Sequence, residues 1–84
     1  MNKTTLSLYT RNRCPLCDKA KRIIEELADM YEFQYEEYDI AKSDELTEEY
    51  GLMIPVVKID DEEIQFGQID KRTIIEGLTK KITK

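Results

Sequence analysis

The sequence predicts an α/β protein with the element order β-α-β-α-β-β-α and one four-stranded mixed sheet. Residues 6–10 alternate apolar and polar side chains, as a strand does. The apolar residues between Ala20 and Tyr31 recur every three or four positions, as on one face of a helix. Two short apolar segments on either side of Asp60-Asp61 predict a hairpin later in the chain. A small sheet flanked by helices accommodates all of these elements.

The first half of the chain is expected to hold two strands and two helices. We predict a strand from Thr4 to Thr10, then a long helix from Pro15 to about Tyr31, since proline fits best at the first helical position. Aromatic residues at a period near two predict a second strand from Phe33 to Ile40. A short acidic helix follows, capped by Ser43 and ended by Gly51.

The second half is expected to form a hairpin and a last helix. The hairpin joins a strand from Pro55 to Ile59 and a strand from Glu62 to Phe66, with Asp60-Asp61 as its turn. Although this turn and the glutamates after it contain four acidic residues, we interpret them as solvated turn residues and not as a cation site. Gly67 ends the last strand, and Asp70 caps the last helix. The apolar face of that helix consists of Ile74, Ile75, Leu78 and Ile82.

The connections predict where a site would lie. The first β-α-β unit should be a right-handed crossover between parallel strands, and the hairpin adds two antiparallel strands. The first strand then lies inside the sheet. The turn that contains Cys14 is therefore expected at the carboxyl end of this strand, where open α/β sheets place their sites.

Length and composition limit the possible classes of protein. Eighty-four residues suffice for one domain, spanning residues 1–84, which we expect to be a monomer. No apolar segment approaches the roughly 20 residues of a membrane span, and the first residues do not resemble a signal peptide, so we expect a cytoplasmic protein. The net charge of −5 argues against nucleic acid and anionic membranes as partners.

The only two cysteines form the segment Cys14-Pro15-Leu16-Cys17 at the predicted strand-to-helix turn. This arrangement indicates a thiol–disulfide redox site. The start of the helix and the nearby charges of Arg11 and Arg13 should lower the pKa of the Cys14 thiol, whereas Cys17, one turn into the helix, should be more buried. The alternative is a pair of small buried side chains without redox chemistry, but this does not explain the flanking proline or the turn.

These residues, together with Met53-Ile54-Pro55 and Gly67 before an Asp70-capped helix, resemble glutaredoxins over nearly the whole chain. The nearest resemblance is to small glutaredoxin-like proteins of poorly assigned function, through the segment from Leu8-Tyr9 to Ala20. The resemblance implies a thioredoxin fold.

The resemblance also implies roles for individual residues. Cys14 would be the nucleophile and Cys17 the resolving thiol. Ile54-Pro55 would be a cis peptide facing the thiols, with the backbone of Ile54 pairing to substrate. Arg11 would contact a glutathione carboxylate, and Gly67 and Asp70 would contact its γ-glutamyl end. The sequence departs from the glutaredoxin pattern at three places that bear on glutathione selectivity: Leu16, the pair Met53-Ile54, and Gln68.

The leading hypothesis is a small dithiol oxidoreductase that reduces protein disulfides or glutathione mixed disulfides. The chain has no flavin or nucleotide motif, so we expect no bound cofactor, and electrons would come from glutathione or a reductase protein. One alternative is a carrier of Cu(I) or an Fe–S cluster, for which a second chain or glutathione would have to supply further ligands, because histidine is absent. Another is a non-catalytic protein-binding or redox-sensing module.

Overall fold

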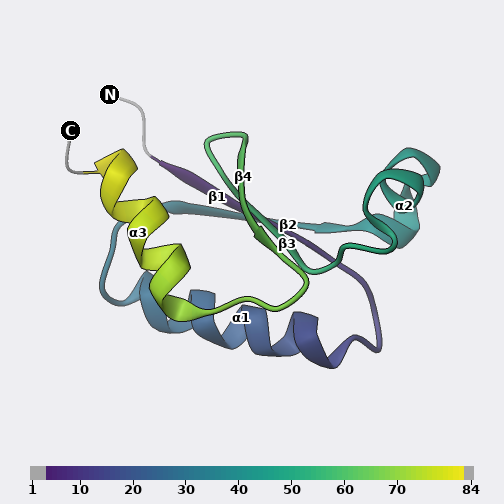
Figure 1. The fold of residues 1–84 in the computed structure, drawn as a ribbon, viewed down its shortest axis with the longest axis horizontal. Helices are drawn as coiled ribbons and strands as arrows, with labels where there is room; N and C mark the ends of the chain where they lie inside the picture. The colour runs from purple at the N-terminus through teal and green to yellow at the C-terminus, as the bar shows by residue number, and fades with distance from the viewer. Residues whose placement is uncertain (1–3, 83–84) are drawn as a thin grey trace.

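A computed structural model describes residues 4–82. Its elements follow the predicted order, with one additional 3-10 turn (Figure 1). They are β1 (Thr5–Thr10), α1 (Pro15–Ala28), β2 (Gln34–Asp39), η1 (Ile40–Lys42), α2 (Asp44–Tyr50), β3 (Val56–Ile59), β4 (Glu62–Phe66) and α3 (Lys71–Ile82).

The four strands form one mixed sheet in the order β2-β1-β3-β4. β1 is parallel to β2, with Tyr9 opposite Tyr38, and antiparallel to β3, with Leu8 opposite Val57. The prediction that the first strand lies inside a mixed sheet is therefore confirmed. The parallel pair results from the α1 crossover, and the antiparallel pair β3–β4 results from the hairpin.

Helices α1 and α3 lie on the same face of the sheet (Figure 1) and enclose the main core with it. Alternation along β1 directs Leu6 and Leu8 into this core, where both are fully buried. Each fully buried leucine stabilises the fold by about 1.5–3 kcal/mol relative to an exposed one. The helices contribute side chains at helical spacing: Ala20, Ile24 and Leu27 from α1, and Ile74 and Leu78 from α3.

The opposite face of the sheet is covered only in part. A second cluster contains Ile40, Tyr50 and Val56, with Tyr9 and Leu46 packed against it. Leu46 and Tyr50 belong to α2, which lies at one end of the sheet (Figure 1). The rest of this face carries polar side chains instead of a helix.

The long helix is shorter than predicted. It ends at Ala28, where the backbone N–H of Asp29 donates back to Glu26 and Leu27. The chain turns at this point, so Met30 leaves the apolar stripe and is 62% exposed. Tyr31 still packs against the main core. The prediction of a helix to about Tyr31 was wrong because the apolar spacing continues through the turn that follows it.

The other boundaries differ by no more than one residue. Ile40 does not belong to the second strand but begins η1, where it is fully buried. Ser43 caps α2 as predicted, since its hydroxyl accepts the backbone N–H of Leu46 at 3.2 Å. Asp60 and Asp61 form the predicted hairpin turn with positive φ values of 52° and 69°, which aspartate tolerates better than most residues. Among residues 4–82, no helix has the length and apolar character needed to cross a membrane.

Candidate active site

Three connections come together at one end of the sheet. Tyr9, near the end of β1, lies opposite Val56, the first residue of β3, and Val56 lies opposite Phe66 at the end of β4. The segments 11–14, 53–55 and 67–70 therefore project from the same end of the sheet. The turn that contains Cys14 lies at the carboxyl end of β1, as the predicted topology required.

The cysteine turn begins α1 in a defined geometry. Arg13 has a φ of 58°, which reverses the chain, and Pro15 occupies the first turn of the helix. Cys14 is the N-cap residue, and its Sγ accepts the backbone N–H of Cys17 at 3.2 Å. A sulfur at this position lies at the positive end of the helix dipole, next to N–H groups that have no partner within the helix.

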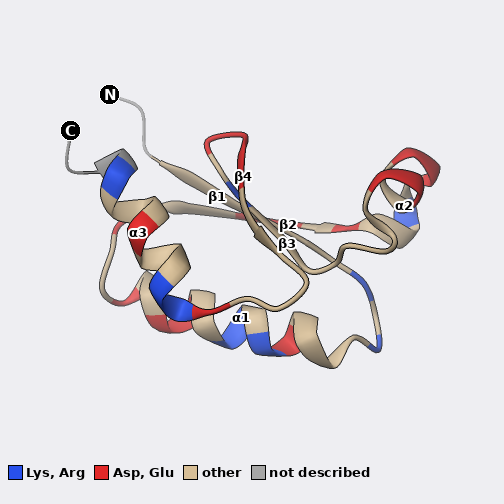
Figure 2. Cartoon of the chain, in the orientation of Figure 1, with Lys and Arg blue, Asp and Glu red and all other residues tan. Residues whose placement is uncertain are grey.

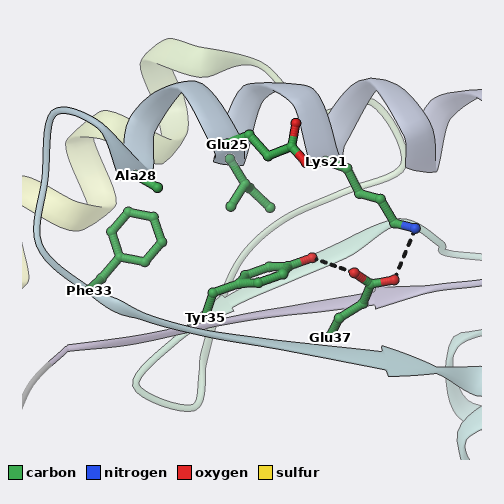
Figure 3. A pocket seen from close by; sticks show the side chains of 7 residues that line it. Lys21, Glu25, Ala28, Phe33, Tyr35 and Glu37 are labelled. Atoms are coloured by element: carbon green, nitrogen blue, oxygen red, sulfur yellow. Dashed lines mark hydrogen bonds and ion pairs between the residues drawn. The ribbon is translucent and has the colours of Figure 1, made fainter.

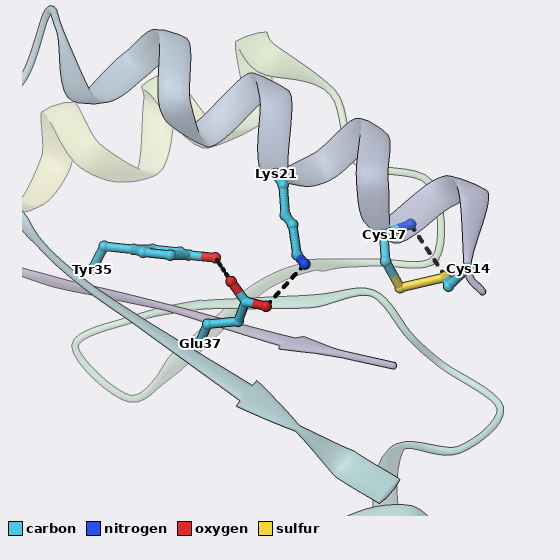
Figure 4. Close-up of polar contacts among 5 residues, drawn as sticks. All are labelled: Cys14, Cys17, Lys21, Tyr35 and Glu37. Carbon is cyan, nitrogen blue, oxygen red and sulfur yellow. Dashed lines mark hydrogen bonds and ion pairs between the residues drawn. A yellow bond between two sulfur atoms is a disulfide. The ribbon is translucent and has the colours of Figure 1, made fainter. Parts of the chain in front are cut away.

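Cys14 and Cys17 form a disulfide, with their Cα atoms 5.1 Å apart (Figure 4). The two residues differ in exposure. Cys14 is partly exposed, whereas Cys17 is fully buried against the core side of α1. The prediction that Cys17 is the more buried of the two is confirmed. Cys14 is therefore the residue of the pair that is open to solvent, whereas Cys17 is covered by the protein.

The second part of the site is the loop before β3. The Ile54–Pro55 peptide bond is cis, as the resemblance implied, and Pro55 is buried. The backbone N–H of Ile54 does not face outward, however, because it donates to the carbonyl oxygen of Tyr50 at 3.1 Å. The expected pairing of the Ile54 backbone to substrate therefore does not extend to this N–H, which is already bonded within the protein. In the turn after α2, this N–H is already hydrogen-bonded to Tyr50.

Gly67 holds this loop against the end of β4. Its backbone N–H donates to the carbonyl oxygens of both Met53 and Pro55, at 2.9 and 2.8 Å. Its φ of +77° is a conformation that side chains disfavour, and a Cβ added here would meet no atom within 4 Å. Glycine at this position is therefore explained by backbone conformation, with open space beside it.

Asp70 caps α3, as predicted. Its Oδ2 accepts the Thr73 N–H at 3.1 Å, and its Oδ1 accepts from Gln65 Nε2 at 3.0 Å and from the Thr73 hydroxyl at 2.8 Å. The hydrogen bonds from Gln65 and then Thr73 lower the pKa of the Asp70 carboxyl. A ligand that used this carboxylate would compete with these internal donors.

The remaining candidate residues lie around the cysteines on the surface. Arg11, Arg13 and Leu16 are exposed, and Leu16 retains 44% of its surface. Within residues 4–82, no acidic side chain pairs with either arginine. Both guanidinium groups are therefore available to a ligand. An exposed leucine between the two cysteines adds apolar surface beside the reactive sulfur.

One group of residues near the cysteines was not predicted. Lys21, one turn after Cys17, forms an ion pair with Glu37 of β2 at 2.9 Å, and Glu37 also accepts the Tyr35 hydroxyl at 2.9 Å (Figure 4). The hydrogen bond to Glu37 raises the pKa of Lys21, and burial followed by the same carboxylate raises the pKa of Tyr35. Side chains alternate between the two faces of β2, and Tyr35 and Glu37 lie opposite Leu6 and Leu8, so both face α1. This alternation is the feature of the sequence that could have indicated the contact with Lys21.

These contacts border a small pocket between α1 and β2, with a volume of about 110 Å³ (Figure 3). Ile24, Ala28 and Phe33 give it an apolar lining, and neither cysteine contributes to it. The ion pair and hydrogen bond join the redox helix to the edge strand. Among the described residues, no three cysteine or acidic side chains are grouped so that they could hold a metal ion.

Comparison with known proteins agrees with this geometry. The model of the glutaredoxin-like domain family (DUF836) matches residues 5–79. A thioredoxin of Methanocaldococcus jannaschii is 30% identical over 87 residues, which cover 98% of this chain and all of the relative.

Solved structures show the same fold. A Nitrosomonas europaea protein determined by solution NMR has a TM-score of 0.78 at 25% identity, over 93% of this chain and 94% of its own. A protein of X. campestris determined by X-ray crystallography has a TM-score of 0.71 at 28% identity, over 89% and 96% of the two chains. A mutant thioredoxin from Halobacterium salinarum, at 19% identity and a TM-score of 0.73, covers 94% of this chain and 74% of its own and supports the fold alone.

Proposed function

Because the chain belongs to the glutaredoxin-like family (DUF836) of the thioredoxin superfamily, we propose that it is a small dithiol oxidoreductase that reduces disulfides through Cys14 and Cys17. A thioredoxin-like fold with a cysteine pair at disulfide distance indicates a thiol oxidoreductase in general. The observation that carries the finer proposal is the asymmetry of the pair. An N-cap sulfur is accessible, and its partner is fully buried one turn later.

In the first step the reduced protein attacks a disulfide. The Cys14 thiolate forms a bond to one substrate sulfur, and the substrate disulfide breaks. The second substrate sulfur leaves as a thiolate and takes a proton from solvent. The helix N-terminus and the Cys17 N–H stabilise negative charge on Cys14 and so favour the attacking form.

In the second step Cys17 resolves the mixed disulfide. Its sulfur, having lost its proton, attacks Cys14, and the bond between Cys14 and the substrate breaks. The substrate leaves as its second thiol, and the Cys14–Cys17 disulfide remains in the protein. The substrate has gained two electrons from the two protein sulfurs, and its two thiolates take protons from solvent, which receives the protons that Cys14 and Cys17 lose.

A thiol donor then restores the dithiol. Two glutathione molecules would do so by forming a mixed disulfide and then glutathione disulfide, and a reductase protein would do so with its own dithiol. Arg11 has no acidic partner among the described residues and could pair with a glutathione carboxylate. The Ile54 carbonyl could accept a hydrogen bond from an extended substrate, whereas the N–H of Ile54 would first have to leave Tyr50. We place the cycle in the cytoplasm, where such donors keep thiols reduced.

Turnover with alternative donors tests the proposal. The protein is given a small disulfide with glutathione, glutathione reductase and NADPH, or a protein disulfide with a thioredoxin-type reductase and NADPH. We expect NADPH oxidation in at least one system, and its loss in Cys14→Ser. The matched change Cys17→Ser is expected to abolish reduction of protein disulfides and to retain reaction with mixed disulfides of glutathione. A protein inactive in both systems would contradict the proposed activity.

A further inference from the structure

The face of the sheet opposite α1 and α3 carries polar groups on its open part. Ser7 lies opposite Glu36, and Tyr9 lies opposite Tyr38, in the parallel pair β1–β2. These side chains alternate with Leu6 and Leu8, which face the main core, so they all project from the other face. α2 covers this face only near Tyr9, through Tyr50.

Acidic residues are concentrated on the elements that border this open face. Residues 36–63 contain eleven acidic side chains and two lysines, a net charge of −9, whereas the rest of the chain has a net charge of +4. One of the eleven, Glu37, faces α1 and pairs with Lys21, and so does not contribute to the open face. Figure 2 shows acidic residues on β2, on α2 and in the β3–β4 turn, basic residues in the loop before α1, and residues of both signs on α1. The open face is therefore suited to a cationic partner.

A polar pocket of about 330 Å³ lies on this face, lined in part by Ser7, Glu36, Tyr38 and Asp61. Ser7 is 9% exposed, and no described residue hydrogen-bonds to its hydroxyl, which keeps some accessible surface and lines the pocket. Asp61 likewise makes no hydrogen bond or ion pair with the described residues. Asp60 differs, because its carboxylate accepts the Thr5 N–H at 3.0 Å and belongs to the turn itself.

The tyrosines of this face present aromatic surface next to these acids. Tyr9 and Tyr38 stack with ring centroids 5.0 Å apart, and Tyr38 remains 37% exposed. The tyrosine rings of this face already make cation–π contacts within the protein. Lys58 Nζ lies 5.4 Å from the centroid of the Tyr9 ring and 5.3 Å from that of the Tyr50 ring. Glu36 accepts the Tyr38 hydroxyl with one oxygen and keeps the other available.

We propose that this pocket binds the guanidinium group of an arginine on a partner protein. A guanidinium is planar, so it can stack on Tyr38 while its N–H groups donate to Glu36 and Asp61 and to the unpartnered hydroxyl of Ser7. A lysine ammonium provides the charge without the planar set of donors. The site does not involve the thiols and does not depend on the proposed redox activity.

NMR titration of the labelled protein tests this assignment. The probes are acetyl-Gly-Arg-Gly-Arg-Gly-amide, the same peptide with lysine in place of arginine, and N-acetylarginine amide. Asp61→Asn removes the carboxylate charge and suits the positive φ of 69°, because asparagine also adopts this conformation. Asp44→Asn on α2 is the control, since it makes the same change of charge at an exposed site outside the pocket.

We expect shifts centred on β1, β2 and the Asp60-Asp61 turn, and tighter binding of the arginine peptide than of either other probe. Asp61→Asn should weaken binding about tenfold, as expected for the loss of a charged hydrogen bond. Asp44→Asn should change it little. Equal affinities for the arginine and lysine peptides, or equal losses of affinity in Asp61→Asn and Asp44→Asn, would show that binding depends only on the overall negative charge. Either result would overturn the proposal. Equal binding of N-acetylarginine amide would overturn the assignment to a partner protein.

Discussion

The reduced Cys14 thiol should titrate well below a free thiol, and the structure allows the size of the shift to be worked out. A thiolate at this position would accept the Cys17 N–H, now 3.2 Å from Sγ, and would lie at the N-terminus of a 14-residue helix. A hydrogen bond to a charged group contributes about 1.5–3 kcal/mol, and a helix terminus about 0.3–1 kcal/mol. Since one pKa unit corresponds to about 1.36 kcal/mol, we expect a decrease of about 2 units from the usual value of about 8.5.

The Cys17→Ser variant isolates this thiol, because it keeps the backbone N–H and removes the second sulfur. Ultraviolet absorbance against pH gives the midpoint, and the same variant unfolded in guanidinium chloride gives the reference value. Burial raises the pKa values of Tyr9 and Tyr35, and the hydrogen bond to Glu36 raises that of Tyr38, so the ionisation of these three tyrosines moves away from the thiol titration. A folded midpoint equal to the unfolded one would refute the argument.

The same shift predicts how stability depends on pH. A thiol with a lowered folded pKa stabilises the fold above its unfolded pKa, and this contribution is lost as pH falls through the folded value. Between about pH 5.5 and pH 9.5, the free energy of unfolding of the Cys17→Ser variant should therefore increase by about 2.7 kcal/mol relative to that of Cys14→Ser/Cys17→Ser. Urea unfolding at both pH values measures the difference. A constant difference between the two proteins would contradict the prediction.

Three further predictions concern the surroundings of the cysteines. Arg11→Ala should slow reduction of the disulfide by glutathione, by no more than about tenfold because the side chain is exposed, and Lys19→Ala should leave the rate unchanged. Equal rates for the two variants in stopped-flow measurements would exclude a contact between Arg11 and glutathione. Asp70→Asn should make the free energy of unfolding less dependent on pH in acid. The lowered pKa of Asp70 stabilises the fold above the unfolded pKa of about 3.9, and this stabilisation is lost as pH falls through the folded pKa. Acid unfolding that is the same in the variant and the wild type would argue against the capping role of Asp70. Gly67→Ala should cost about 1 kcal/mol in urea unfolding through its φ of +77° alone, and a larger loss would indicate a clash that the open space does not predict.

The order of elements could be predicted because each has its own hydrophobic period. Leu6 and Leu8 alternate with Ser7 in β1, whereas Ile24 and Leu27 follow the helical spacing of α1, and all four apolar residues are buried. The end of α1 could not be predicted in the same way. Met30 continues the spacing after the helix has ended at Ala28, and only the backbone turn exposes its side chain.

The site was predictable where it is local in sequence. Cys14 and Cys17 are three residues apart, so the helix start alone determines that one caps the helix and the other is buried. The cis Ile54–Pro55 bond followed from resemblance, since a proline before a strand is compatible with either isomer. The bond from the Ile54 N–H to Tyr50 depends on how the chain leaves α2.

The pair Lys21–Glu37 joins a helix to a strand sixteen positions later and depends on their packing. Neither residue lies in a motif, and charged residues at both positions are equally compatible with exposure to solvent. The parity of β2 against β1 identifies Glu37 as facing α1 only once the register of the two strands is known.

Capture of a mixed disulfide tests the central claim, the division of roles between Cys14 and Cys17, most directly. Reduced Cys17→Ser and Cys14→Ser proteins are each exposed to the same disulfide substrate, and trapped complexes are mapped by peptide mass spectrometry. We expect the substrate to be attached to Cys14 in Cys17→Ser and little complex in Cys14→Ser, because Cys17 is fully buried. Efficient capture on Cys17, with none on Cys14, would contradict the proposed mechanism.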